Sequence, residues 1–192
     1  MQITSKYDGL KTIESLGLPR PNWKFIKVSD AVPNKPWTVS LYGWTIRSLS
    51  TSTYDYAIPS KHNVSYETIK YNIDEMYRGS GYVNYVVYPS WRFNVSGCLM
   101  IDNPMAVLEA VFGDISSLLR GKKNPDITVF DNSVRFISKL VEYRINNSLD
   151  RIIVHQISSA FRVLTDFGFN RINLEWTLTL DKEFFFHDLA AF

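Results

Sequence analysis

The sequence has one cysteine, Cys98, and no apolar run long enough to cross a bilayer. A lone thiol excludes an internal disulfide framework and a cysteine-rich zinc site. Cys98 lies in the apolar run 95–101, which lacks the positive charge and exposure that activate a thiol, so we expect a buried structural cysteine. A membrane-spanning helix needs about 20 apolar residues, and no signal-peptide pattern begins the chain. We therefore expect no membrane contact and a cytoplasmic location.

The chain also has little excess charge. Its 21 Lys and Arg residues against 19 Asp and Glu residues leave a net charge of +2. This balance does not indicate a protein that coats a polyanion, although it permits a local phosphate site. Aromatic and basic residues alternate within 82–92, as on base-stacking surfaces, but a β-rich core explains the 15% aromatic content equally well. Nucleic acid is therefore the least favoured partner.

Internal repeats and low-complexity segments are absent, and the 192 residues, 45% of them hydrophobic, suffice for one core or two small lobes. Hydrophobic periodicity predicts helices at 8–16, 65–77, 114–119 and 149–167. It predicts strands at 23–28, 37–44, 82–88, 93–101, 105–112, 127–130, 134–137, 173–180 and 183–189, with 134–137 also compatible with a helix. Asp8 is the expected cap of the first helix. Segment 45–56 is predicted to be a polar loop, and 82–112 an antiparallel meander. This order indicates an α+β fold.

Two carboxylates lie in the expected C-terminal hairpin. Glu175 and Asp188 would face each other across its two strands. Two hard oxygen ligands at that separation suit Mg²⁺, which takes one or two carboxylates together with phosphates and water. Alternatively, Glu175 is a solvated strand residue and Asp188 a charge at the sheet edge. Strict alternation along the strand would turn His187 away from Asp188.

Four segments match a known pattern in their order and spacing. They are Lys6 followed by Leu16-Gly17-Leu18-Pro19, then Ile46-Arg47-Ser48, Val95-Ser96-Gly97-Cys98-Leu99, and Leu174-Glu175-Trp176 followed by Phe184 to Asp188. Together they resemble the nucleotide-binding, ATP-grasp region of phosphoenolpyruvate synthase and pyruvate phosphate dikinase. The chain departs from that family at three places: the arginine motif has one of two serines, Tyr88 replaces a glutamine near the base pocket, and Asp188 replaces a metal-binding glutamine.

The resemblance implies a single ATP-grasp-like domain over 1–192, with two small lobes, approximately 1–80 and 81–192, whose antiparallel sheets surround a nucleotide cleft. It implies ATP and Mg²⁺ as cofactors. Lys6 and Arg47 would contact phosphates, with Arg47 also catalytic. Glu175 and Asp188 would bind the metal.

Tyr88 would line the base pocket, and Glu109 would contact a ribose hydroxyl or, through water, the adenine amino group. Simpler roles stay open for three of these residues: solvent exposure for Lys6, packing for Tyr88, and for Glu109 a salt bridge with Arg120 or Lys122.

The function implied is Mg²⁺-dependent binding of an adenine nucleotide, with phosphoryl transfer or ligation to an acceptor that is a small molecule or a partner protein. The alternative is a catalytically inactive nucleotide-sensing or protein-interaction module. A complete phosphoenolpyruvate synthase is excluded, because 192 residues have no room for the swivelling histidine domain or the pyruvate-binding barrel of that family.

Overall fold

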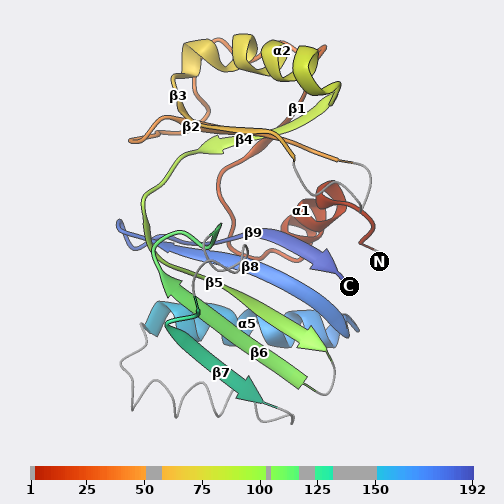
Figure 1. The fold of residues 1–192 in the computed structure, drawn as a ribbon, viewed down its shortest axis with the longest axis vertical. Helices are drawn as coiled ribbons and strands as arrows, with labels where there is room; N and C mark the ends of the chain where they lie inside the picture. Colours follow the sequence, from red (N-terminus) through yellow and green to blue (C-terminus); the bar gives the residue numbers. More distant parts are fainter. Residues whose placement is uncertain (1–2, 51–57, 103–104, 117–123, 132–150) are drawn as a thin grey trace. The chain divides into compact units, whose positions relative to one another are not determined.

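A computed structural model describes residues 3–50, 58–102, 105–116, 124–131 and 151–192 of the chain. The chain divides into two compact units. Unit 1 comprises Met1–Asp8 and Pro21–Arg92, and unit 2 comprises Gly9–Arg20 and Phe93–Phe192. Each unit contains one antiparallel sheet (Figure 1), so the expected α+β class with two antiparallel sheets is confirmed. The division falls at residues 92 and 93, while the expected lobes met at 80 and 81.

Unit 1 is a four-stranded sheet covered on one face by a helix. Its strand order is β1-β4-β2-β3. The strands are β1 (Lys24–Lys27), β2 (Trp44–Ser48), β3 (Ser60–Val64) and β4 (Asn84–Pro89), and the helix α2 (Ile69–Ser80) follows a 3-10 turn, η1 (Tyr66–Thr68). Figure 1 shows α2 lying along the sheet. Ile69, Ile73 and Met76 recur on one face of α2 and join the core with Ile46 and Val87.

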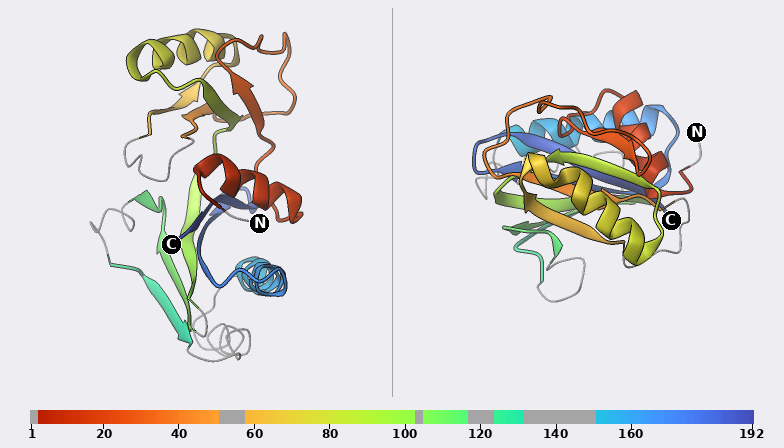
Figure 2. Two further views of the ribbon diagram at one scale, coloured as in Figure 1. Left: turned by 90° about the vertical axis from the view of Figure 1, so that its right-hand side faces the viewer. Right: turned by 90° about the horizontal axis from the view of Figure 1, so that it is seen from above.

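Unit 2 is a five-stranded sheet of order β7-β6-β5-β8-β9. The strands are β5 (Phe93–Asp102), β6 (Met105–Phe112), β7 (Ile127–Asp131), β8 (Arg171–Thr179) and β9 (Phe184–Ala191), and the long helix is α5 (Arg151–Asp166). Leu108, Leu99, Leu174 and Leu189 are register neighbours across four strands, and each is 0% exposed. This leucine row is part of the core of unit 2. Figure 2 shows α5 beside the sheet.

The first helix, α1 (Lys6–Ser15), is capped one turn earlier than expected. Ser5 precedes the helix, and its Oγ accepts a hydrogen bond from the Asp8 N–H at 3.2 Å. The Asp8 carboxylate in turn accepts bonds from the Thr4 hydroxyl at 2.7 Å and the Ser5 hydroxyl at 2.9 Å. The prediction of Asp8 as the cap is wrong: Ser5 caps α1, and Asp8 completes the capping arrangement from the third helical position.

Three other expectations require correction. Residues 37–43 are not a strand, because Pro36 and Gly43 interrupt the alternating pattern and β2 begins only at Trp44. Strand β2 therefore runs into the segment predicted as a polar loop, and β3 was not predicted. Segment 82–112 is not a meander, since β4 pairs with β1 and β2 while β5 and β6 pair in the other sheet.

The remaining predicted elements agree with the structure to within a few residues. The predicted strand at 134–137 and most of the predicted helix at 114–119 lie outside the described residues. No helix in the described ranges is long and apolar enough to span a membrane.

Candidate functional site

One face of the sheet in unit 2 carries a row of ionisable side chains. The register pairs Glu109 with Cys98, Cys98 with Glu175, and Glu175 with Asp188. Directly paired residues on neighbouring strands point to the same side of a sheet. These four residues, which we call the acidic row, therefore extend from β6 through β5 and β8 to β9. The expected pairing of Glu175 with Asp188 is confirmed.

A β-bulge brings His187 to the same side as the acidic row. Trp176 pairs with Phe186 and Glu175 pairs with Asp188, which leaves His187 as the extra residue on β9. Its Nδ1 lies 3.8 Å from Glu175 Oε2, and its Nε2 lies 3.0 Å from Thr177 Oγ1. The expectation that His187 faces away from Asp188 assumed strict alternation and is wrong, because a bulge interrupts that alternation.

Buried hydroxyls anchor the His187 ring. Thr177 Oγ1, which contacts the ring, also lies 3.1 Å from Ser96 Oγ, and both residues are 0% exposed. The chain Ser96–Thr177–His187–Glu175 thus links β5, β8 and β9 through side chains. Such a network fixes the orientation of the imidazole next to Glu175.

Negative charge dominates the acidic row. Asp188 is 6% exposed, and the Glu175 side chain is 14% exposed. Glu109 and Glu175 flank Cys98, whose Sγ lies 4.0 Å from Glu109 Oε2. Burial, followed by the charges of these two carboxylates, raises the pKa of Cys98 to about 12. The row therefore places one carboxylate on each side of the buried thiol and pairs a second carboxylate with Glu175.

The donor atoms of the acidic row fit Mg²⁺ better than a closed structural metal site. Within the described part of the chain, no three His, Cys, Asp or Glu side chains converge closely enough to hold a metal ion. Mg²⁺ does not require such a set, because one or two carboxylates complete its shell with phosphate oxygens and water. Glu175 and Asp188, paired across β8 and β9, are the two carboxylates that could take this role.

Two other expected site residues share one face of the sheet in unit 1. Arg47 pairs with Val86, and Thr45 pairs with Tyr88, on the neighbouring strands β2 and β4. Alternation places Arg47 and Tyr88 on the face opposite α2, because Ile46 belongs to the core beneath that helix. The Tyr88 ring is 8% exposed and stacks on Trp91 with ring centroids 5.2 Å apart.

The expected residues thus fall into two groups, one in each unit. Lys6 is the first residue of α1 and belongs with Arg47 and Tyr88 to unit 1. Glu109, Glu175 and Asp188 belong to unit 2, where they share the acidic row. The residues considered as salt-bridge partners of Glu109, at 120 and 122, lie outside the described residues.

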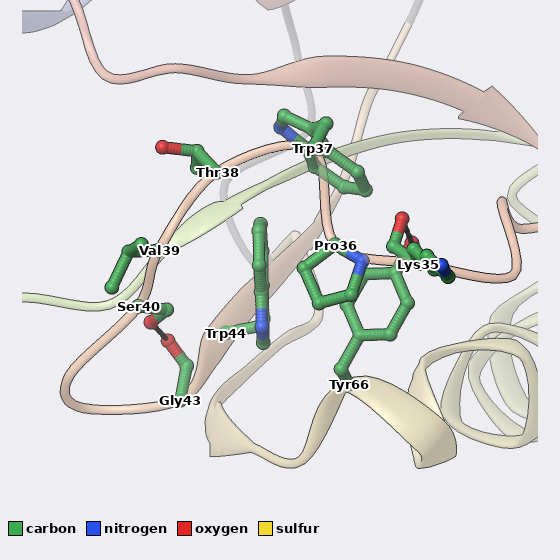
Figure 3. Close-up of a pocket in the computed structure, with 9 residues that line it drawn as sticks. All are labelled: Lys35, Pro36, Trp37, Thr38, Val39, Ser40, Gly43, Trp44 and Tyr66. Carbon is green, nitrogen blue, oxygen red and sulfur yellow. Dashed lines mark hydrogen bonds between the residues drawn. The ribbon is translucent and has the colours of Figure 1, made fainter.

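Unit 1 also contains a pocket that the sequence reasoning missed. Its volume is about 650 Å³. Figure 3 shows the residues that line it: Lys35, Pro36, Trp37, Thr38, Val39, Ser40, Gly43, Trp44 and Tyr66. The pocket was not predicted because residues 37–44 were expected to form a strand, whereas residues 37–43 form a loop. The two prolines at 33 and 36 and the glycine at 43 were the signal that could have revealed a loop.

Sequence comparison gives no relatives: no family model and no curated protein matches the chain. Solved structures do match. The D-alanine-D-alanine ligase from Coxiella burnetii has a TM-score of 0.55 at 12% identity, covering 95% of this chain and 45% of its own. The ADP complex of PurK, N5-carboxyaminoimidazole ribonucleotide synthetase, has a TM-score of 0.54 at 10% identity, covering 98% of this chain and 45% of its own.

A third similar structure is the D-cycloserine synthetase DcsG, with a TM-score of 0.51 at 8% identity, covering 98% of this chain and 62% of its own. The chain therefore spans about half the length of these enzymes. At such identities the likeness concerns the fold alone. The similar structures are ATP-grasp enzymes, and each alignment includes nearly all of this chain. The protein therefore has an ATP-grasp fold.

Proposed function

We propose that the protein binds ATP with Mg²⁺ and uses it for ligation or phosphoryl transfer to an acceptor that is a small molecule or a partner protein. The observation that carries the proposal is the pairing of Glu175 with Asp188 in the acidic row of an ATP-grasp fold. Further support comes from the similar structures, which are named as a ligase and synthetases, one of them in complex with ADP.

In this proposal, unit 2 supplies the metal ligands. Glu175 and Asp188 would hold Mg²⁺ through their carboxylate oxygens, and His187 would fix the position of Glu175 from the bulge in β9. The bound ion would supply positive charge that offsets the charge of the phosphates. Glu109, at the other end of the acidic row, accepts a hydrogen bond from a ribose hydroxyl.

Unit 1 supplies the phosphate contacts. The planar guanidinium of Arg47 contacts two phosphate oxygens and neutralises charge that develops as the terminal phosphoryl group leaves. Lys6 acts as a point charge. The Tyr88 ring contacts the base, and its stack on Trp91 holds that ring in place.

The second candidate is a module that binds nucleotide without turnover. The observation that favours it is the buried position of Tyr88, whose ring already stacks on Trp91 and is 8% exposed. The resemblance to the phosphoenolpyruvate synthase family in particular stays a prediction. Membership of that family would favour phosphoryl transfer, whereas the similar structures, named as a ligase and synthetases, favour ligation.

Calorimetric titration with ATP, in the presence and absence of Mg²⁺, tests the proposal. We expect Mg²⁺-dependent binding that Glu175→Gln and Asp188→Asn each weaken at least about tenfold, because each removes one charged ligand. Glu183→Gln is the matched control, since Glu183 is an exposed carboxylate next to the same hairpin strand. Absence of ATP binding, or equal affinity in all three variants, would refute the proposal.

Turnover separates the two candidates. Release of ADP in the presence of amine or carboxylate acceptors supports an enzyme, and we expect Arg47→Gln to lower the rate about a hundredfold, as for loss of one transition-state contact. Arg78→Gln, on the exposed surface of α2, is the control. Mg²⁺-dependent ATP binding without ADP release under any acceptor supports the sensing module.

A further inference from the structure

The pocket in unit 1 is built around three aromatic rings. The Trp37 and Trp44 rings lie with centroids 4.5 Å apart, and the Tyr66 ring lies 5.9 Å from Trp37 and 5.3 Å from Trp44. Figure 3 shows the Trp44 ring standing between the Trp37–Ser40 segment and the rings of Pro36 and Tyr66. The volume of about 650 Å³ lies within the usual range for small-molecule sites.

The polar groups of these aromatic residues bond to the backbone. The Tyr66 hydroxyl lies 2.8 Å from the carbonyl oxygens of both Pro33 and Lys35, and it donates its one proton to either of them. Trp37 Nε1 donates to the carbonyl of Asn22 at 2.8 Å, and the Ser40 hydroxyl donates to the carbonyl of Gly43. These hydrogen bonds fix the conformation of the loop 33–43, which surrounds the pocket. The parts of Trp37, Trp44 and Tyr66 that line the pocket therefore offer mainly apolar surface to an occupant.

Positive charge borders the rings. Lys35 lines the pocket, and Lys24 Nζ lies 4.9 Å from the centroid of the Trp37 ring. No Asp or Glu is among the lining residues, all of which the structure describes. Val39 lines the same pocket and is 81% exposed, so its apolar surface is also accessible to a bound group. Apolar rings beside lysines match a planar apolar group that carries negative charge.

The pocket lies on the opposite side of the sheet from Arg47 and Tyr88, two of the proposed nucleotide contacts of unit 1. Trp44 belongs to the core beneath α2, and Trp37 and Tyr66 pack against that core. Arg47 and Tyr88 occupy the other face, as the register of β2 and β4 requires. We propose that the pocket lined by Lys35, Trp37, Trp44 and Tyr66 binds a planar aromatic group bearing a carboxylate or another anionic substituent, separately from ATP.

NMR titration with two probes of the same ring, 2-naphthoate and 2-naphthylmethanol, tests this proposal. We expect the anionic probe to bind several-fold more tightly than the neutral one. Lys24→Gln and Lys35→Gln should each weaken naphthoate binding roughly two- to fivefold, the size expected for one exposed charge, and leave the alcohol unchanged. Trp37→Leu should abolish binding of both probes.

Lys27→Gln is the matched control. Lys27 lies on the same strand as Lys24, but the odd spacing places it on the opposite face of the sheet. Equal affinity for the two probes, an equal effect of Lys24→Gln and Lys27→Gln, or no binding at millimolar concentration would each overturn the proposal. The lysine variants keep the test valid if Trp37→Leu does not fold.

Two further titrations define the ligand. If Mg²⁺-ATP displaces naphthoate, the pocket belongs to the nucleotide site and the proposal of a separate site is wrong. A tripeptide ending in phenylalanine, compared with its C-terminal amide, distinguishes a chain terminus from a free aromatic acid. Tighter binding of the tripeptide with the free carboxylate supports a pocket for an aromatic group with a negative charge, whether the natural ligand is a peptide terminus or a free acid. Tighter binding of the amide contradicts the proposal.

Discussion

Gly97 lies in β5 where the neighbouring strands leave no room for a side chain. A Cβ at this position would lie 2.1 Å from the carbonyl oxygen of Glu109 and 2.6 Å from Cζ2 of Trp176. We therefore expect Gly97→Ala to lower the free energy of unfolding by about 3 kcal/mol or more, because buried backbone must shift. Urea denaturation measures the change. Gly79→Ala in α2, with no atom within 4 Å, is the control and should raise stability by up to about 1 kcal/mol.

Cys98 should be unreactive in the folded protein. Burial and the nearby Glu109 and Glu175 raise the pKa of its thiol to about 12. At pH 8 the thiolate fraction is then on the order of one in ten thousand, and only the thiolate reacts. Labelling with a disulfide reagent should therefore proceed at the rate of unfolding and rise with added urea. Rapid stoichiometric labelling in buffer at pH 8 would contradict this expectation.

The capping arrangement of α1 should make helix stability depend on pH. Hydrogen bonding by the Thr4 hydroxyl is the main cause that lowers the pKa of Asp8 in the folded protein. A lowered folded pKa means that the stabilisation is present above the unfolded value and is lost as pH falls through the folded value. Asp8→Asn should therefore cost about 1 kcal/mol at pH 7 and progressively less as the pH falls through the folded pKa of Asp8.

The measurement for this prediction is thermal or urea unfolding of the variant and the original protein across that pH range. Asp166→Asn is the control, because Asp166 lies at the exposed C-terminal end of α5, where a negative charge opposes the helix dipole. It should not lower stability at pH 7. A cost that persists unchanged at pH 2 would mean that Asp8 stabilises α1 by something other than its charge.

Periodic apolar spacing was enough to predict most elements. Ile69, Ile73 and Met76 in α2 and the alternating residues of β8 and β9 each define one buried face. Strand pairing could not be predicted in the same way. The residues from Tyr85 to Tyr88 are all buried, so their pattern shows no preferred face and does not say which sheet the strand joins.

The candidate site was predictable only in part. The pairing of Glu175 with Asp188 was expected from two strands joined by a short turn, but it depends on the bulge in β9, because the register of Trp176 with Phe186 would otherwise pair Glu175 with His187. The position of His187 was not predictable, because a bulge adds one residue to β9 and its location depends on packing across the sheet. The aromatic pocket was equally hidden, since Trp37, Trp44 and Tyr66 meet only after the loop has folded.

For the molecule as a whole, we expect hydrogen exchange to be slowest in β5 and β8. Each of these strands has partners on both sides, and Leu99 and Leu174 are 0% exposed. Strand β3 should exchange at least roughly a hundredfold faster, because it is an edge strand without buried residues. Native-state exchange followed by NMR tests this order, and equal protection of β3 and β5 would contradict it.

Helix α1 approaches β9 so closely that a Cβ at Gly9 would lie 1.9 Å from the carbonyl oxygen of Leu189. The Phe186 N–H also donates to the carbonyl of Pro19 at 2.8 Å. The segments that meet here lie far apart in the sequence, so α1 is synthesised well before β9. All strands of unit 1 are available once Pro89 has been synthesised, whereas unit 2 waits for β9. During synthesis, α1 must therefore remain without its native neighbour until β9 emerges.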